Sequence, residues 1–124
     1  MAKIATHKDL RVYQSSLRAA MVIYQLSKSF PVEEKFSLTD QIRRSSRSVC
    51  ANLAEAFRKR RYPKNFVSKL SDCEAEAAET HVWLDFALAC DYIKIEDYEK
   101  LYKEYDMILG MLVKMIVEPE KWNL

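Results

Sequence analysis

SLTDQIRRSSRSVCANLAEAFRKRR, residues 37–61, has the residue spacing of one long helix with three distinct faces. Apolar residues recur at steps of three, four or seven, and this spacing places them in a stripe along one face. A second face, about a third of a turn away at about 100° per residue, carries arginines. A third face offers side chains that form directional hydrogen bonds. The stripe that predicts a packed core consists of Leu38, Ile42, Val49, Leu53, Ala56 and Phe57.

The composition of the whole chain also favours helix. The chain has 124 residues, which is enough for one domain with a real core and too few for two. It contains a single glycine and three prolines, whereas sheet proteins need glycine-rich turns. Hydrophobic residues make up 49% and charged residues 31%, which fits a soluble globular protein.

Four helices are predicted from the apolar periodicity and from the residues that start and stop helices. Thr6 with Asp9 and Ser37 with Asp40 have the spacing of a capping box, with Asp in place of the usual Glu. Proline interrupts the pattern at positions 31, 63 and 119. The predicted helices span residues 7–29, 38–62, 64–90 and 96–117. With their short links they predict an all-α fold, an antiparallel up-down-up-down four-helix bundle that forms a single domain over residues 1–124.

The charges are sorted along the chain, although the net charge is only +2. Residues 37–70 contain nine Lys or Arg and two Asp or Glu, a net charge of +7. Residues 71–124 contain five Lys or Arg and thirteen Asp or Glu, a net charge of −8. Such a separation indicates a polar partner, a contact between acidic and basic faces of two subunits, or both.

Seven cationic side chains in or next to the opening stretch are the candidate nucleic-acid-binding residues. Arginine makes bidentate contacts with phosphate, and a row of cations can follow a phosphate backbone. Small residues between the arginines would let another surface approach. Three interpretations stay open for this row: contact with nucleic acid, contact with the acidic third helix of a neighbouring subunit, and plain solvation. The seven residues are Arg43, Arg47, Arg58, Lys59, Arg60, Arg61 and Lys64.

Two other groups of residues are candidates for structural contacts. The third face carries Gln41, Arg44, Asn52 and Glu55, which we interpret as a structural polar network whose members need partners from other helices. The predicted third helix has a second apolar face, for which a lone bundle has no use. This face predicts an oligomer interface that includes Val82, Trp83 and Phe86.

Several motifs resemble those of a known family. DLRVYQ at residues 9–14, FPVEEKFSLTDQIRRSSRSVCANLAEA at residues 30–56 and the Glu-rich third helix are similar to the bacterial four-helix-bundle 23S rRNA intervening-sequence proteins. The resemblance covers residues 9–116. This chain has Ala56 where members of the family commonly have glycine, which predicts that the second helix continues unbent into RKRR. The residues that match the family pattern are Phe30, Pro31, Gln41, Arg44, Asn52 and Glu55.

The resemblance implies a homopentamer, a barrel of bundles with a basic surface proposed to bind RNA or DNA. Members are often encoded within insertions in the large ribosomal RNA gene. The accessory variability protein of diversity-generating retroelements is similar in fold, which suggests a reverse transcriptase as one possible protein partner. The biochemical role of the family is poorly defined, so the resemblance predicts the fold far better than the function.

The sequence has no signature of catalysis or of a bound cofactor. It contains no glycine-rich phosphate loop and no GxSxG, HExxH or paired-cysteine motif. We therefore predict no catalytic residues, no metal site and no cofactor. Glu74 and His81 lie on the main stripe of the third helix, where we interpret His81 as a hydrogen-bonded core histidine.

The cysteines and the apolar runs predict the compartment. Cys50, Cys73 and Cys90 form no zinc-binding spacing, and we interpret them as reduced thiols that act as small core residues. No run has the length of a signal peptide or approaches the about 20 apolar residues that span a bilayer. The sequence therefore predicts a cytoplasmic protein without membrane contact.

These observations predict a non-enzymatic, oligomeric bundle that binds RNA or DNA through the basic face of the second helix, mainly by phosphate contacts. The alternative is a protein-interaction scaffold or accessory subunit, whose basic and acidic faces serve self-assembly or a protein partner.

Overall fold

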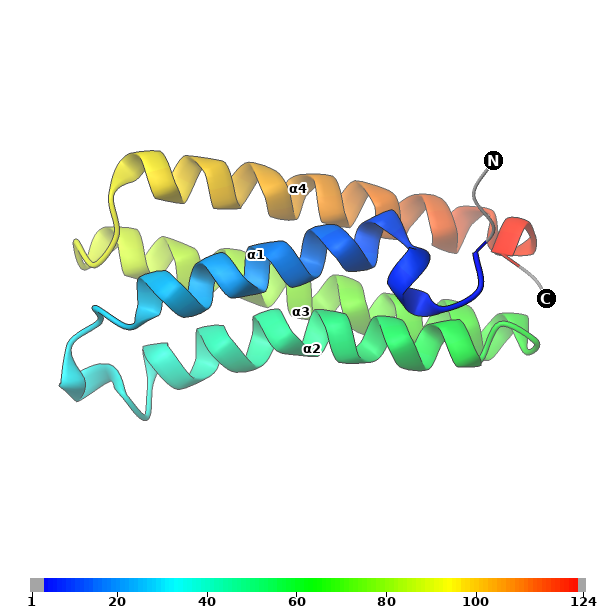
Figure 1. The fold of residues 1–124 in the computed structure, drawn as a ribbon, viewed down its shortest axis with the longest axis horizontal. Coiled ribbons are helices and arrows are strands. Elements are labelled where there is room, and N and C mark those ends of the chain that lie inside the picture. The colour runs from blue at the N-terminus through cyan, green and yellow to red at the C-terminus, as the bar shows by residue number, and fades with distance from the viewer. Residues whose placement is uncertain (1–3, 123–124) are drawn as a thin grey trace.

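The computed structural model describes residues 4–122, which form a bundle of four antiparallel helices (Figure 1). Each helix packs along the helix that follows it in sequence, and the last closes the ring against the first. The predicted all-α four-helix bundle is therefore confirmed. The helices are α1 (Arg11–Ser27), α2 (Leu38–Arg58), α3 (Pro63–Ala89) and α4 (Ile95–Val117), and the 3₁₀ turns are η1 (His7–Asp9), η2 (Val32–Glu34) and η3 (Pro119–Trp122).

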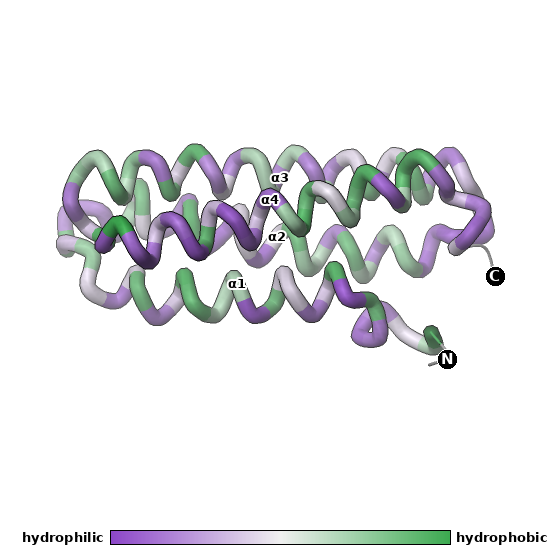
Figure 2. The backbone as a smooth tube through the Cα atoms, turned by 90° about the horizontal axis from the view of Figure 1, so that it is seen from above, coloured by the Kyte–Doolittle hydropathy of each residue, from purple (hydrophilic) through white to green (hydrophobic). Residues whose placement is uncertain are grey.

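The core lies between the four helices, and apolar and polar residues alternate along each of them (Figure 2). The predicted stripe of α2 is buried, with each of its six side chains between 0% and 6% exposed. On α1 the core face carries Ala19 and Ile23, whereas Leu17 and Met21 are 45% and 50% exposed. One side of α1 is therefore an apolar surface that the single chain leaves uncovered.

A polar pair joins α2 and α3 inside the core. Ser45 and Thr80 are fully buried, and their hydroxyl oxygens lie 2.8 Å apart. Thr80 donates to the Glu76 carbonyl oxygen at 2.9 Å, which favours Ser45 as the donor to Thr80 over its longer contact of 3.4 Å with the Ile42 carbonyl oxygen. Because both hydroxyls are hydrogen-bonded, burying them costs little, and their pairing fixes how α2 and α3 lie against each other.

The helix starts differ in part from the predicted ones. The capping box of Thr6 and Asp9 is present, but it caps the 3₁₀ turn η1, because Leu10 is extended and α1 begins only at Arg11. α2 begins at the predicted residue, but Ser37 makes no capping hydrogen bond. The carboxylate of Glu34 takes that place and accepts from the Leu38 amide at 3.3 Å and from the Ser37 hydroxyl at 2.6 Å.

α2 ends at Arg58, four residues before the predicted end, so the expectation of an unbent helix through RKRR is wrong. Lys59 leaves the helical conformation, and the Tyr62 amide donates to the Lys59 carbonyl oxygen to form a turn. The reason is the start of α3 at Pro63: two antiparallel helices need a few residues to reverse the chain, and a residue before proline avoids helical geometry.

Gly110 lies inside α4, where glycine costs about 1 kcal/mol relative to alanine. It is exposed, and a Cβ atom placed on it would meet no other atom within 4 Å. Gly110→Ala is therefore expected to raise the free energy of unfolding by about 1 kcal/mol. Urea unfolding followed by circular dichroism measures the change, and the reverse substitution Ala78→Gly, at an exposed position of α3, is the matched control. A loss of stability in Gly110→Ala would contradict the open environment of this residue.

The three cysteines lie in different surroundings. Cys73 is buried and Cys50 is partly buried, and burial raises the pKa of Cys73 to about 12 and that of Cys50 to about 11. Both thiols are therefore uncharged and poorly nucleophilic at neutral pH. Cys90 is exposed at the end of α3, so its interpretation as a core residue is wrong.

Candidate nucleic-acid interface

Three cations lie close to one aromatic ring where α1 packs against α2, and two of them belong to the seven predicted nucleic-acid-binding residues. The Tyr24 ring centroid lies 4.9 Å from the Lys28 ammonium and 4.9 Å and 5.6 Å from the guanidinium carbons of Arg43 and Arg47. Arg43 is also held by a hydrogen bond of 2.8 Å from its Nε to the Ser27 hydroxyl. We call these three cations and Tyr24 the Tyr24 cluster; the ring fixes like charges close together through cation–π contacts.

An open groove of about 600 Å³ runs beside the Tyr24 cluster along the first half of α2. Arg43, Arg44 and Arg47 form part of its wall, and Phe36 lies in the lining at the start of the helix. Asp40 is the single acidic residue among the lining side chains. The groove is therefore a cationic depression with an aromatic side chain.

The other predicted cations gather where α2 meets α3. Arg58, Lys59, Arg61 and Lys64 are exposed around the turn, whereas Arg60 packs its guanidinium 3.5 Å above the centroid of the Phe57 ring and donates from Nε to the Phe57 carbonyl oxygen at 2.8 Å. Burial and the charge of Arg58 lower the pKa of Arg60. About 16 Å of helix, eleven residues at about 1.5 Å each, separates this group from Arg47. The predicted row of seven cations is therefore divided into two groups.

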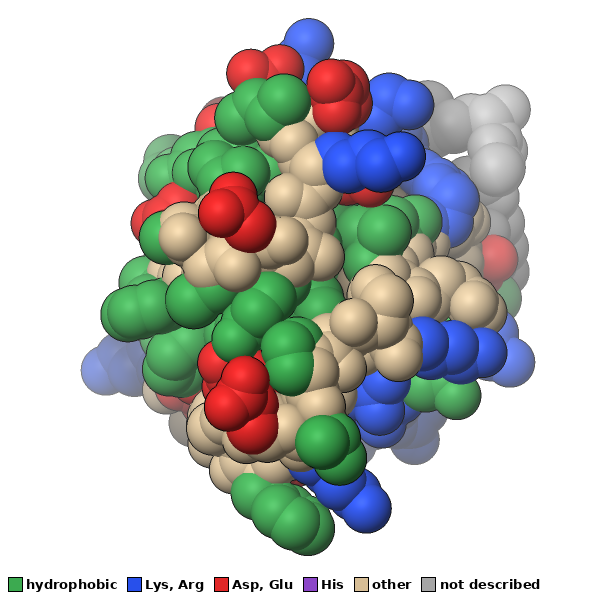
Figure 3. Space-filling model, turned by 90° about the vertical axis from the view of Figure 1, so that its left-hand side faces the viewer, with side chains coloured by type: hydrophobic (Ala, Val, Ile, Leu, Met, Phe, Trp, Pro, Cys, Tyr) green, Lys and Arg blue, Asp and Glu red, His purple; other side chains and the backbone are tan. Residues whose placement is uncertain are grey.

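None of the seven predicted cations forms an ion pair within residues 4–122. The ion pairs of this part of the chain involve Arg44, Lys69, His81 and Lys121. Seen from the end of the bundle where α1 passes into α2, Lys and Arg side chains gather on one side and most Asp and Glu side chains on the other (Figure 3). Among the described residues no acidic side chain is ion-paired with these seven cations, and Asp40 is the one carboxylate that lines the groove beside them.

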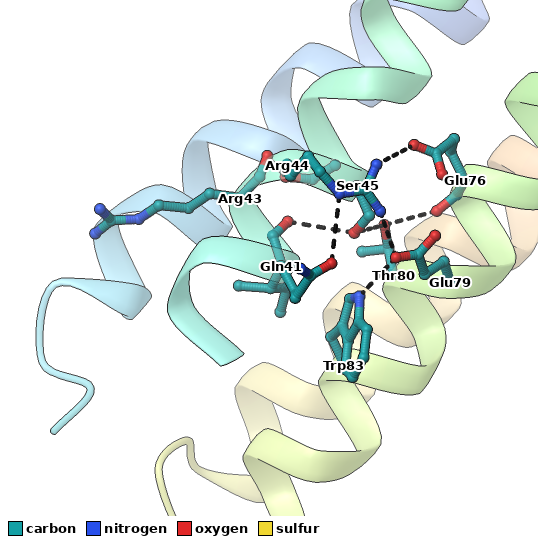
Figure 4. A network of polar contacts seen from close by, with 10 residues as sticks. Gln41, Arg43, Arg44, Ser45, Glu76, Glu79, Thr80 and Trp83 are labelled. Carbon is teal, nitrogen blue, oxygen red and sulfur yellow. Dashed lines mark hydrogen bonds and ion pairs between the residues drawn. The ribbon is translucent and has the colours of Figure 1, made fainter. Parts of the chain in front are cut away.

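Arg44 forms part of the groove wall and also belongs to a structural clamp with α3 (Figure 4). Its guanidinium pairs with Glu76 at 2.9 Å and with Glu79, and the hydrogen bond to Glu79 is the main cause of its raised pKa. Burial favours a raised pKa for Glu79, but hydrogen bonds from Arg44 and Trp83 outweigh it and lower that pKa. Gln41 accepts from Arg44 at 3.4 Å. All three charges of the clamp, those of Arg44, Glu76 and Glu79, are therefore paired within the chain.

The predicted polar network is divided between two places. Gln41 and Arg44 lie together in the clamp, whereas Glu55 pairs with Lys69 of α3 at 3.0 Å. Asn52 is half-buried and makes no side-chain hydrogen bond to residues 4–122. The four residues lie on one face of α2, as their spacing predicted, but they do not form one connected network.

The three residues predicted for an oligomer interface differ in how exposed they are and in their contacts within the chain. Val82 and Phe86 are 46% and 53% exposed, whereas Trp83 donates from Nε1 to Glu79 at 3.2 Å and packs against the core. Phe86 and Trp83 line a groove of about 220 Å³ that also includes Leu38 and Cys90. Trp83 thus already serves the clamp, and Val82 and Phe86 offer the exposed apolar area.

His81 and Glu74, the two polar residues on the main stripe of α3, do not form a metal site with the other described residues. His81 stacks on Tyr102 with ring centroids 3.9 Å apart, and its Nε2 lies 3.1 Å from the Tyr102 carbonyl oxygen and 3.5 Å from an Asp106 carboxylate oxygen. The hydrogen-bond contact predicted for His81 is present, but the side chain is only partly buried and lies outside the core cluster, so its interpretation as a core residue is wrong. Glu74 is half-buried and forms no ion pair with the described residues. Within residues 4–122, no three His, Cys, Asp or Glu side chains are placed to hold a metal ion.

The helices of residues 4–122 include no candidate for a membrane-spanning segment. None of them combines the length and the apolar character that crossing a bilayer requires.

Sequence reasoning missed three residues of the interface. The sequence pattern places Tyr24 and Lys28 within the predicted helix of residues 7–29 and Phe36 in the link that follows it, and gives none of the three a role in binding. The signal that links them is tertiary: α1 and α2 must pack before Tyr24 reaches the arginines of α2.

Comparison with known proteins agrees with the motifs. The family model of 23S rRNA-intervening sequence proteins matches residues 8–114. A solved structure from Bacteroides thetaiotaomicron, a protein of unknown function from the S23 ribosomal protein family, is similar in sequence and fold. The two are 34% identical, the match covers 85% of this chain and 97% of that one, and the TM-score is 0.76. No curated protein matches the chain. With most of its length matched by the family model, the chain belongs to the family of 23S rRNA-intervening sequence proteins.

Proposed function

We propose that this protein binds nucleic acid, RNA or DNA, through the basic surface of α2 and the α2–α3 turn, mainly by phosphate contacts and without catalysing a reaction. The observation that carries the proposal is that seven cations, in two groups along α2 and the turn that follows it, form no ion pair within residues 4–122, whereas Arg44 and Lys69 nearby are paired. Unpaired clustered cations raise the local concentration of polyanions.

The arrangement favours phosphate over base recognition. The cations lie on a helix face and a turn, and the guanidiniums of the Tyr24 cluster are held by a ring and a hydroxyl. Held guanidiniums present donors to phosphate oxygens at little entropic cost. Contacts of this kind carry no sequence information, so we expect little preference among sequences.

The salt dependence of binding tests the proposal. Fluorescence anisotropy with labelled RNA and DNA oligonucleotides of about 20 nucleotides should give a dissociation constant that rises steeply with salt. With four or more phosphates contacted, a plot of the logarithm of the association constant against the logarithm of the salt concentration should have a slope of about −3 or steeper. Failure of every oligonucleotide to bind at low salt, or an affinity that ignores salt, would overturn the proposal.

We further propose that the protein acts as a homo-oligomer, with a pentamer as the expected state. Half-exposed Val82 and Phe86 on α3 and Leu17 and Met21 on α1 supply apolar area for such contacts. Each subunit would add its copy of the basic surface, so contacts that are weak singly would sum to a useful avidity. Light scattering measures the assembly, and a stable monomer at micromolar concentration would contradict it.

A second candidate function is that of a protein-interaction scaffold, including an accessory role beside a partner such as a reverse transcriptase. The separation of charge favours it, because the acidic residues 71–124 of one copy complement the basic α2 of another. In that case high salt would dissociate the oligomer, and oligonucleotides would compete with assembly rather than bind to it.

A further inference from the structure

Phe36 is an aromatic side chain in an unusual place. It precedes α2 in the connection from α1, and it is 85% exposed although full burial of such a side chain is worth about 1.5–3 kcal/mol. The Lys35 ammonium lies 5.4 Å from the centroid of its ring. A large apolar ring that is left this exposed, in contact with a neighbouring lysine, is available to a partner.

The place of Phe36 relative to the cations narrows the kind of partner. Phe36 lines the same groove of about 600 Å³ as Arg43 and Arg47. Cations that hold a phosphate backbone beside an aromatic ring that stacks a base are the combination by which proteins bind single strands. In a duplex the base faces are stacked on one another, so an exposed ring could reach a base only after unstacking it.

The local charge argues against an acidic peptide strand or a lipid surface as the better match. The groove is confined to one side of α2 and combines three guanidiniums with one ring, and Arg44 among them is already neutralised by Glu76 and Glu79. The remaining charges of the lining are those of Lys35, Arg43 and Arg47, set against Asp40, and so small a set of charges suits one or two nucleotides. A second copy of this chain is the remaining occupant, because its acidic helices also complement the arginines.

We propose that the groove at the start of α2 binds a single-stranded nucleic acid, with one base stacked on Phe36 and the adjoining phosphates on Arg43 and Arg47. This inference rests on the proposed function of the basic surface and adds the substrate class: unpaired strands are preferred to duplexes of the same length.

The test compares single and double strands on the full chain. The probes are a 12-nucleotide or similarly short oligothymidine, about the length covered by known single-strand sites, and a mixed-sequence duplex of equal length. Phe36→Ala is expected to weaken binding of the single strand about 5- to 150-fold and to leave duplex binding unchanged. A strand with 2-aminopurine should lose fluorescence on binding to the wild type and recover it with Phe36→Ala, because stacking quenches that base.

Val32→Ala is the matched control, since Val32 lies in the same connection, is 87% exposed and does not line the groove. It should bind both probes as the wild type does. If the wild type binds both probes and Phe36→Ala binds the single strand equally well, the stacking site is wrong while the basic surface stands. If the wild type binds neither probe, both proposals fall. If Phe36→Ala changes the molecular mass in light scattering and not the affinity, Phe36 belongs to a contact between copies, and the inference is overturned.

Discussion

Replacing Arg47, Arg58, Arg61 and Lys64 together by glutamine is expected to weaken nucleic-acid binding by about two to three orders of magnitude at about 0.1 M salt. All four side chains are exposed, and none forms an ion pair within residues 4–122. Each phosphate contact that is lost removes about 0.7 from the salt slope on a single strand, so the slope should fall by about 3. Anisotropy titrations at several salt concentrations measure both quantities.

The choice of these four positions keeps the fold intact. Arg43 and Arg60 are left in place because they pack on the Tyr24 and Phe57 rings, and their removal would mix loss of packing with loss of charge. Thermal unfolding of the variant should match that of the wild type within about 0.5 kcal/mol, as for other surface substitutions.

A second variant separates local from overall charge. Lys94, Lys100, Lys103 and Lys114 are exposed on the α3–α4 link and α4, without ion pairs in the described chain, and their replacement by glutamine removes the same net charge. Binding should change only a few-fold. Equal losses in both variants would mean that net charge alone attracts the nucleic acid, and an unchanged affinity in the first would refute the proposed surface.

The fold was largely predictable because burial follows periodicity. The six apolar residues of α2 recur on one face, and all six lie in or beside the core. The helix ends were less predictable, since they depend on contacts that periodicity does not contain. The carboxylate that caps α2 is that of Glu34, not the hydroxyl of Ser37, and it also accepts from Tyr92 across the bundle at 2.9 Å.

The site was predictable as a set of residues and not as an arrangement. Arg43 and Arg44 are neighbours in sequence, but successive helical positions point about 100° apart. Arg44 therefore reaches the acidic residues of α3, while Arg43 turns to Ser27 and Tyr24 of α1. The sequence contains both arginines, and only the packing of three helices decides which of them stays available.

Tyr105→Phe is expected to raise the free energy of unfolding by about 1–3 kcal/mol, which is the cost of an unmade hydrogen bond. Tyr105 is fully buried in the core, and its hydroxyl has no hydrogen-bond partner among the described residues. In the unfolded chain that hydroxyl is bonded to water, so folding loses the bond, whereas phenylalanine keeps the ring contacts and removes the loss.

Tyr105 is also expected to make the wild type less stable at alkaline pH. Burial raises the pKa of Tyr105 far above its ordinary value, and the neighbouring Cys50 and Glu104 add to the effect. Above about pH 10 the unfolded tyrosine loses its proton while the folded one keeps it, so the unfolded state gains stability as the pH rises. The advantage of Tyr105→Phe over the wild type should therefore be larger at about pH 10.5 than at pH 7.

Urea unfolding at the two pH values measures this difference, with Tyr62→Phe as the matched control. Tyr62 is 57% exposed, so its hydroxyl is solvated in both states, and its loss should change stability by less than about 0.5 kcal/mol at pH 7. A Tyr105→Phe variant that is less stable than the wild type would mean that the hydroxyl is hydrogen-bonded in solution. Since the Tyr105 ring lies beside His81 of α3 and near Cys50 of α2, such a bond would tie α4 to another helix of the core, as the bond between Ser45 and Thr80 ties α2 to α3.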